Sequence, residues 1–330
     1  MSMSSPSLSS KTDLPRPTMK EATAIAHLLD RYYLFAATGV SALVIHLNYY
    51  ARTMQEGLLP RYQQFARLIS AGFDALAAGG QAPTFPMWGY GWLFVVTENR
   101  LGLLVVQSVL ALFAVWFLIR HVERQHLLGT QATRALKLLV ICSLPWYAFH
   151  ALRWPYSINV SLTLISLVLF HRAVVSERIE TRTLILSGVL FGAALNFRSD
   201  YSLLPLGLAT AMCCVCRPVS RVLGKMTIWL VSIYFALIPW MLYTWHVAGR
   251  PLLMSTNGGH VLFIGLGTLP DNKWGITISD TDPEMLRALR EHFGRPEDSM
   301  SFAGDQFLKH EFLHRIRSDL RSREGAPPPP

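Results

Sequence analysis

The most recognisable chemical motif in this sequence is HExxH at residues 310–314. On a helix, His310 and His314 would lie on one face and could bind Zn²⁺, with Glu311 as a general base. The acids after this motif follow too closely to supply the usual third ligand, so His260 or His292 would have to fold back. The apolar spacing over 302–320 favours an ordinary amphipathic helix instead. A zinc metalloprotease is therefore a minor alternative.

Asp280 and Asp282 form a DxD pair, a spacing that can hold a metal ion bound to a nucleotide sugar. Pro283 follows directly and a helical pattern begins there, so we expect Asp282 to be a helix N-cap. The sequence contains neither a P-loop nor a Rossmann glycine pattern. ATP- or NAD-driven chemistry is thus disfavoured.

Two arginines stand in short turns between apolar runs. Arg153 precedes Trp154, and Arg198 lies two residues before Asp200. Charge near a membrane interface is costly and is more often functional than incidental, and the arginine fork suits phosphate. The structural alternatives are an interfacial anchor for Arg153 and a local ion pair for Arg198.

The segments that must position these residues are apolar. Hydrophobic residues make up 51% of the chain, charged residues only 15%, and mean hydropathy is +0.31, whereas soluble domains carry about 25% charge. We therefore expect an all-α polytopic membrane protein with about seven transmembrane helices. The spans have little charge at mid-depth, which disfavours a transporter of ionic solutes. The seven apolar runs are 32–48, 101–119, 138–152, 157–175, 183–197, 201–216 and 226–246.

The net charge of +9 belongs to the apolar part of the chain. Residues 1–246 hold 20 Lys or Arg against 10 acids, and 247–330 hold 10 against 11. Loop orientation explains this excess, so no nucleic-acid partner is expected. Basic loops at 120–137, 171–182 and 217–225 are predicted to be cytoplasmic by the positive-inside rule.

This orientation defines the predicted domains. Residues 1–31 form a disordered cytoplasmic lead, 32–246 the transmembrane domain, and 247–330 an extracytoplasmic C-terminal region with a Pro-rich end. The 49–100 loop also lies outside, which requires that 84–97 does not span. Within this loop, residues 60–79 show helical apolar spacing, which predicts an amphipathic helix on the membrane surface. The alternative is a helix that covers the bundle.

Several features occur in an order that resembles a known family. They are an acid near the start of the first outer loop, Tyr62, Ala66 and Gly72, the aromatic stretch 83–92, Leu144 with Pro145, Gly188 and Gly192 before Arg198, Pro239 with Trp240, and the run 255–259. Together they resemble the integral-membrane glycosyltransferases of the GT-C fold. The most similar set is family 39, the dolichyl-phosphate-mannose and aminoarabinose transferase-like enzymes. The resemblance covers roughly residues 30–315.

The resemblance implies a multi-pass protein of the bacterial inner (plasma) membrane. Such an enzyme moves a sugar from a polyprenyl-phosphate donor to a glycan, lipid or protein acceptor outside. One carboxylate would act as general base or hold a divalent cation. The family has this carboxylate four residues before the tyrosine, where this chain has Leu58; Glu56 is the nearest acid and Asp74 the alternative.

The resemblance also implies substrate-binding residues. Arg153 and Arg198 would bind the donor phosphate, and Tyr62 would lie beside the substrate. Asn257 and Gly258 could approach a phosphate or sugar through the backbone, or could form a plain turn. A truncated or inactive relative that acts as a membrane scaffold is the alternative function, because the chain stops in four prolines.

Overall fold

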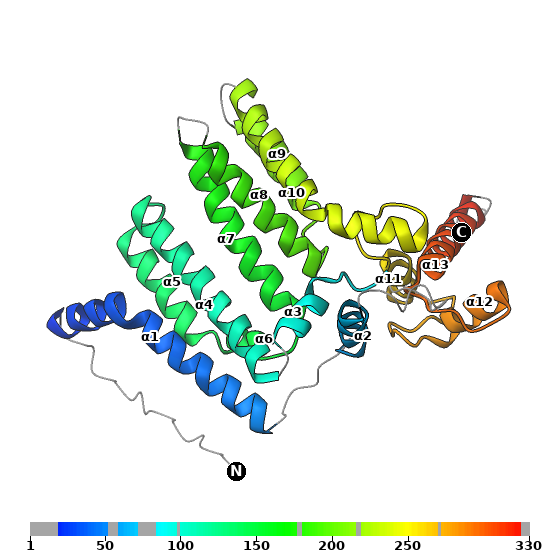
Figure 1. Cartoon of the computed structure of the whole chain (residues 1–330), viewed down its shortest axis with the longest axis horizontal. Helices are drawn as coiled ribbons and strands as arrows, with labels where there is room; N and C mark the ends of the chain where they lie inside the picture. Colours follow the sequence, from blue (N-terminus) through cyan, green and yellow to red (C-terminus); the bar gives the residue numbers. More distant parts are fainter. Residues whose placement is uncertain are drawn as a thin grey trace, which may run out of the picture.

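The computed structural model describes residues 19–51, 59–71, 84–97, 100–176, 180–215, 219–269 and 272–324. Within these ranges the fold is all-α, as predicted, with thirteen α-helices, one 3₁₀ turn and no strand. Figure 1 shows the long helices side by side, with the C-terminal helices apart from them and two short helices between. The long helices and their connections are α1 (Met19–Ala51), α4 (Arg100–Arg124), α5 (Thr130–Cys142), α6 (Leu144–His150), α7 (Pro155–Val175), α8 (Thr181–Phe197), α9 (Leu204–Val215) and α10 (Val219–Ala248). The remaining helices are α2 (Leu59–Ser70), α3 (Gly89–Thr97), α11 (Gly258–Gly265), α12 (Pro283–Phe293) and α13 (Phe302–Glu324).

Four of these helices are long and apolar enough to cross a membrane, which indicates a membrane protein. The candidate spanning segments are Ala26–Tyr49, Leu101–Arg124, Pro155–Val175 and Val219–Ala248. Each of the other predicted runs is also helical, but α8 has 17 residues and α9 has 12. The run 138–152 is divided between α5 and α6 at Ser143. Since an α-helix rises about 1.5 Å per residue, these pieces are shorter than a hydrocarbon core of about 30 Å. The seven-span arrangement stays a prediction.

The first helix begins earlier than predicted. The lead was expected to run to residue 31, but α1 begins at Met19, so 19–31 is helical; residues 1–18 lie outside the described ranges. Asp30 in this part of α1 binds Lys137 of α5 at 2.8 Å. Glu123 of α4 binds the same ammonium group at 2.7 Å. Lys137 is only 2% exposed, so the ion pairs that satisfy its charge also join three helices.

Glycine spacing on α8 sets the close packing of α8 against α10. A Cβ added at Gly188 would lie 2.5 Å from the carbonyl oxygen of Trp229, and one at Gly192 would lie 2.5 Å from that of Ile233. The two backbones can approach this closely only because both positions lack a side chain. Trp229 fills the adjoining core against Phe170, with ring centroids 4.4 Å apart.

A lysine from α10 caps the C-terminal end of α7. Lys225 of α10 is buried and donates to the carbonyl oxygens of Ala173, Val174 and Ser176 at 3.0, 2.9 and 2.6 Å. The last carbonyls of a helix have no partner within the helix and carry partial negative charge. The Lys225 ammonium group satisfies them in the protein interior.

The amphipathic helix of the first loop covers the bundle. In α2 the apolar residues Tyr62 and Phe65 are at most 1% exposed. The Phe65 ring lies 6.4 Å from Trp240 and 6.0 Å from Tyr243, both in α10. Protein therefore buries the apolar face that we expected on the membrane surface. The helix ends at Ser70, and 72–79 lie outside the described residues.

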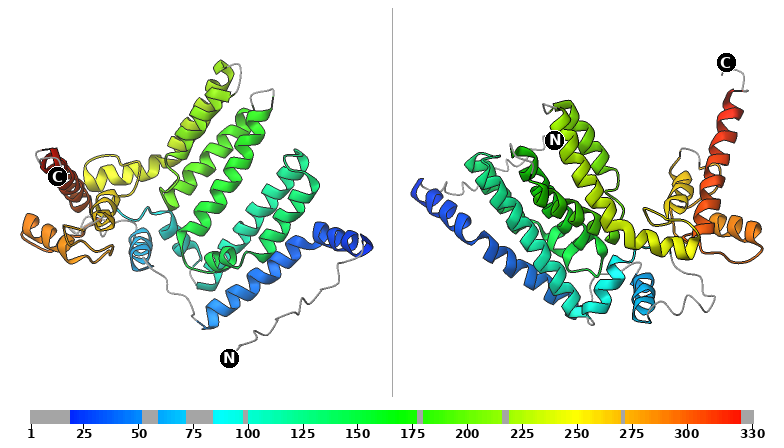
Figure 2. Two further views of the ribbon diagram at one scale, coloured as in Figure 1. Left: turned by 180° about the vertical axis from the view of Figure 1, so that it is seen from behind. Right: turned by 45° about the horizontal axis from the view of Figure 1, so that its top comes forward.

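The C-terminal helices α11, α12 and α13 pack around their own apolar cluster. Its buried members are Phe263, Leu266, Ile276, Met285, Leu289 and Leu308. Figure 2 shows these helices apart from the long ones in two further views, with the last turns of α10 directed toward them. Pro239 lies inside α10, and proline removes one helical hydrogen bond and favours such a bend. Asp282 is the N-cap of α12 as predicted, and its side chain accepts a hydrogen bond from the Met285 N–H at 2.7 Å.

Candidate binding site

Three of the predicted substrate-binding residues line one small polar pocket. Tyr62 comes from α2, Arg198 from the turn after α8, and Asn257 from the segment before α11. They are far apart in sequence, so the tertiary fold brings them together. The other lining residues are Phe85, Pro86, Met87, Phe197, Ser199, Asp200 and Ser255.

Arg198 is held in place on three sides. Its Nε and Nη2 atoms donate to Asp200 at 2.8 and 3.1 Å, which is the local ion pair considered above. The guanidinium carbon lies 3.7 Å from the centre of the Tyr156 ring. Asn159 fixes the turn by donating to the carbonyl oxygens of Ala194 and Arg198 at 2.8 and 2.9 Å. Burial lowers the pKa of Arg198, but its bonds to Asp200 raise that pKa above the usual value, so the group is a fixed cation.

Tyr62 supplies a buried hydroxyl beside this cation. Its ring packs edge-on against Tyr90, with centroids 5.0 Å apart. Burial raises the pKa of Tyr62 well above its usual value, and the nearby Arg198 charge offsets only part of that rise. The phenol is therefore neutral and can donate. No hydrogen bond of normal geometry engages this hydroxyl in the part of the chain that is described. A buried donor of this kind is ready for a ligand atom.

The polar pocket is narrow. Its free volume is about 10 Å³, which is close to the minimum for one water molecule. A phosphate group is larger than a water molecule and would need the walls to separate. One wall is the 255–257 segment, which precedes α11.

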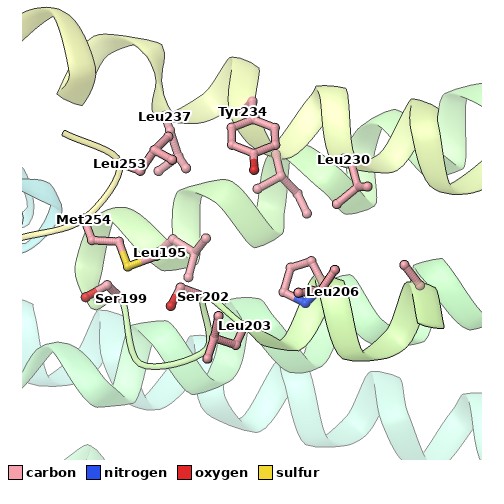
Figure 3. Close-up of a pocket in the computed structure, with 13 residues that line it drawn as sticks. Leu195, Ser199, Ser202, Leu203, Leu206, Leu230, Tyr234, Leu237, Leu253 and Met254 are labelled. Atoms are coloured by element: carbon pink, nitrogen blue, oxygen red, sulfur yellow. The ribbon is translucent and has the colours of Figure 1, made fainter. Parts of the chain in front are cut away.

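A larger apolar groove adjoins the polar pocket. It has a volume of about 300 Å³ and lies between the α8–α9 region, α10 and residues 253–254. Figure 3 shows Leu203 and Leu206 facing Leu230, Tyr234 and Leu237 across it. Leu206 is 67% exposed, so the groove is open to the surroundings of the helices. Ser199 lines both cavities and marks where they meet.

The remaining predicted site residues are not among those that line this pocket. Arg153 lies in the turn between α6 and α7 and lines neither cavity. Glu56 and Asp74, the two candidates for the catalytic carboxylate, lie outside the described residues. Asp200 is the one carboxylate among the lining residues, and the sequence had suggested only its pairing with Arg198.

Gly258 and Gly259 form neither a plain turn nor a wall of the pocket. They are the first residues of α11, and the left-handed glycines in the described residues are Gly249, Gly275 and Gly294. Close backbone approach does occur, but toward protein. The Gly259 N–H donates to Asp305 at 2.6 Å, and Gly258 lies beside Lys309. Asn257 thus remains in the candidate site, whereas Gly258 does not line it.

The HExxH residues lie on α13, whose helical character was predicted. His310 and His314 are exposed, and Glu311 binds Arg315 at 2.7 Å. No group of three His, Cys, Asp or Glu that could hold a metal ion occurs among the described residues. Asp280 instead accepts a hydrogen bond from His260 Nε2 at 3.0 Å, and His260 Nδ1 lies 2.9 Å from the Ser299 hydroxyl. These contacts link α11 to the two segments that flank α12.

Comparison of the chain with protein-family models, curated proteins and solved structures gave no match. The geometry of this site is therefore the basis for assigning a function to the protein.

Proposed function

We propose that this protein is an integral-membrane glycosyltransferase that takes a sugar from a polyprenyl-phosphate donor. The observation that carries the proposal is the junction at Ser199 between an apolar groove of about 300 Å³ and a pocket that contains Arg198. A polyprenyl-phosphate sugar has the same two parts, an apolar chain and an anionic head. The groove would hold part of the chain, and Arg198 would pair with the phosphate.

The charge of the pocket suits one phosphate group. Asp200 accepts hydrogen bonds from Nε and Nη2 of Arg198, and the Nη1 donors lie outside this pair. The neutral Tyr62 hydroxyl and the Asn257 amide add uncharged donors in the same space. A headgroup with one or two negative charges would find the Arg198–Asp200 ion pair, whose charges largely cancel, and two neutral donors, which favours binding that can later be released.

In the transfer step, an acceptor hydroxyl would attack the anomeric carbon of the sugar. The bond from that carbon to the phosphate oxygen would break, and polyprenyl phosphate would leave with the electron pair. A carboxylate would take the proton of the acceptor hydroxyl. Glu56 remains our proposal for this base, with Asp74 as the alternative; the acceptor would be a glycan, lipid or protein outside the bacterial plasma membrane.

A divalent cation does not fit the described residues. Hard cations such as Mg²⁺ need several oxygen ligands, and Asp200, the one carboxylate that lines the pocket, is already bound by Arg198. Among the described residues, Arg198 is therefore the group that we propose for phosphate binding.

The proposal is tested by the binding of polyprenyl phosphate to purified protein in nanodiscs, measured by native mass spectrometry. Arg198→Ala should abolish binding, and Leu206→Trp should weaken it by filling the groove. Leu139→Trp is the matched control, because Leu139 is 64% exposed on α5 and does not line the groove. Equal binding by the two Trp variants would remove the groove from the proposal.

The transfer reaction is tested in cells. Mass spectrometry of cell-envelope glycans and polyprenyl-phosphate sugars should show one sugar moving from lipid to glycan only when the protein is present. Unchanged profiles together with intact lipid binding would favour the inactive scaffold.

A further inference from the structure

Residues 255 and 257 form one wall of the polar pocket. The opposite side is built from the α8–α9 turn and from Phe85, Pro86 and Met87, which precede α3. The free volume of about 10 Å³ admits no phosphate in this arrangement. Because the 255–257 segment belongs to the part of the chain that leads into the C-terminal helices, its position depends on how those helices are held.

A continuous series of hydrogen bonds holds this wall. Thr256 is buried, and its N–H donates to the carbonyl oxygen of Thr84 at 3.1 Å. Its hydroxyl donates to the Met300 carbonyl oxygen at 2.8 Å and lies 2.5 Å from the Thr84 hydroxyl. Since the Thr256 hydroxyl has one proton, the Thr84 hydroxyl is the donor in that second contact. Thr256 is thus fixed to the first loop and to Met300.

Asp298 extends this series to α2. Its Oδ1 atom accepts from the Met300 N–H at 3.0 Å and from Arg61 Nη2 at 3.0 Å, and its Oδ2 atom accepts from Arg61 Nη1 at 2.9 Å. The two parallel bonds from Arg61 form the bidentate geometry that makes an ion pair directional. The pair joins residues 237 positions apart in the sequence.

Arg61 also belongs to the opposite side of the pocket. It precedes Tyr62 in α2, and its guanidinium carbon lies 5.8 Å from the centre of the Phe85 ring. Both Tyr62 and Phe85 line the pocket. The Arg61–Asp298 pair therefore spans the two sides whose separation would enlarge the cavity.

We propose that Asp298 is a positioning residue that, through Arg61, latches the 255–257 wall closed, and that release of this latch admits an anionic headgroup to the pocket. The latch is partly exposed, with side chains of Arg61 and Asp298 at 31% and 40%. Exposed ion pairs are weak, which suits a contact that must open and close repeatedly. The identity of the headgroup rests on the proposed function, but the opening of the wall does not.

The test measures how often the wall opens, in the full-length protein in nanodiscs. The four native cysteines are replaced by alanine, and Ser255→Cys is labelled with a charged maleimide. Arg61→Gln and Asp298→Asn should each raise the labelling rate about two- to fivefold, the range expected for loss of a partly exposed pair. The double variant should label no faster than either single variant, because all three lack the same contact. Glu291→Gln, a change to an exposed carboxylate of α12 that faces Arg287, is the matched control.

The Arg61→Lys variant distinguishes loss of the bidentate contact with Asp298 from a general loss of structure. Lysine keeps the charge but lacks the fork, so its labelling rate should lie between those of the wild type and Arg61→Gln. Arg61→Lys also provides a test of the latch if Arg61→Gln does not fold. Latch variants should bind polyprenyl phosphate with a faster association rate than the wild type, a change that loss of structure would not produce.

Labelling rates equal to that of Glu291→Gln, or additive effects in the double variant, would overturn the latch. If the wild type binds no polyprenyl phosphate, the proposed function fails, while the labelling rates still decide the latch.

Discussion

The backbone N–H of Gly259 in α11 donates a hydrogen bond of 2.6 Å to the carboxylate of Asp305 in α13. A Cβ at Gly259 would lie 2.0 Å from the carbonyl oxygen of Asp305, whereas one at Gly258 would lie 3.3 Å from the flexible end of Lys309. Gly259→Ala should therefore lower stability by about 1 to 3 kcal/mol, a usual cost of overpacking. Gly258→Ala should be tolerated. Thermal unfolding of the purified variants checks this order; weaker lipid binding by folded Gly258→Ala would restore its predicted role in the site.

Removal of the Tyr62 hydroxyl should have opposite effects on folding and binding. The buried hydroxyl has no partner of normal geometry among the described residues, and such a group costs about 1 to 3 kcal/mol. Tyr62→Phe should therefore be as stable as the wild type or more stable. If the hydroxyl donates to the donor phosphate, its loss should weaken binding by about 1.5 to 3 kcal/mol. Thermal unfolding and lipid titration measure the two effects, and unchanged binding would assign Tyr62 to packing alone.

The catalytic carboxylate can be assigned by two conservative substitutions. Glu56→Gln keeps size and hydrogen bonding but removes the charge, so loss of a general base should lower transfer about 10²- to 10⁴-fold. Asp74→Asn is the internal comparison and should matter little. Transfer that survives Glu56→Gln and fails with Asp74→Asn would move the role to Asp74. Survival of both would remove the carboxylate mechanism.

The sequence could predict the elements but only part of their assembly. Apolar run length identified the helices, and Asp282 before Pro283 identified a cap, because both patterns are local. The break at Ser143 was missed because the run was assigned by its length and hydropathy alone, although Pro145 is a local signal for the start of a new helix. An amphipathic face does not specify whether lipid or protein covers it, so the sequence left both positions open for α2, and its packing against Trp240 matches the bundle-covering alternative.

The residues of the candidate site could likewise be predicted only in part. Arg198 and Tyr62 were predicted from local pattern and resemblance, and they do line one pocket. Arg153 has similar local surroundings but lies elsewhere, because two turns with the same residue types can face different parts of a bundle. The contact of Arg61 with Asp298 has no local pattern, and only the tertiary fold reveals it.

The latch should resist moderate acid. Burial raises the pKa of Asp298, but its bonds to Arg61 and Met300 outweigh this and hold the pKa below the ordinary value of 3.8. A carboxyl group with a lowered pKa in the folded state contributes stability above its unfolded pKa, and this is lost as the pH falls through the folded pKa. Because the thiolate is the reactive form, the labelling rate of Ser255→Cys is divided at each pH by that of an exposed reference cysteine. This ratio should be constant at neutral pH and rise only below about pH 4. Asp298→Asn should remove this step; an increase near pH 6 would implicate another group.

The predicted orientation can be tested at two serines. Ser279 lies between α11 and α12, and Ser176 follows α7. If the positive-inside rule applies, Ser279→Cys should react with an impermeant maleimide from outside intact cells, and Ser176→Cys should not. The reverse pattern would place the candidate site on the cytoplasmic side and exclude an extracytoplasmic acceptor.

Lys137 and Lys225 each belong to loops whose charge predicts orientation, yet both are at most 3% exposed in the folded protein. Carboxylates engage Lys137, and helix carbonyls engage Lys225. Neither ammonium group can then attract lipid headgroups. Any influence that these two lysines have on orientation must therefore act during synthesis, before the helices associate. The same positive charges would orient the helices during insertion and stabilise the helix bundle afterwards. A neutral residue in place of either lysine could therefore leave the topology unchanged, where the loop is longer, and still prevent the helices from packing together.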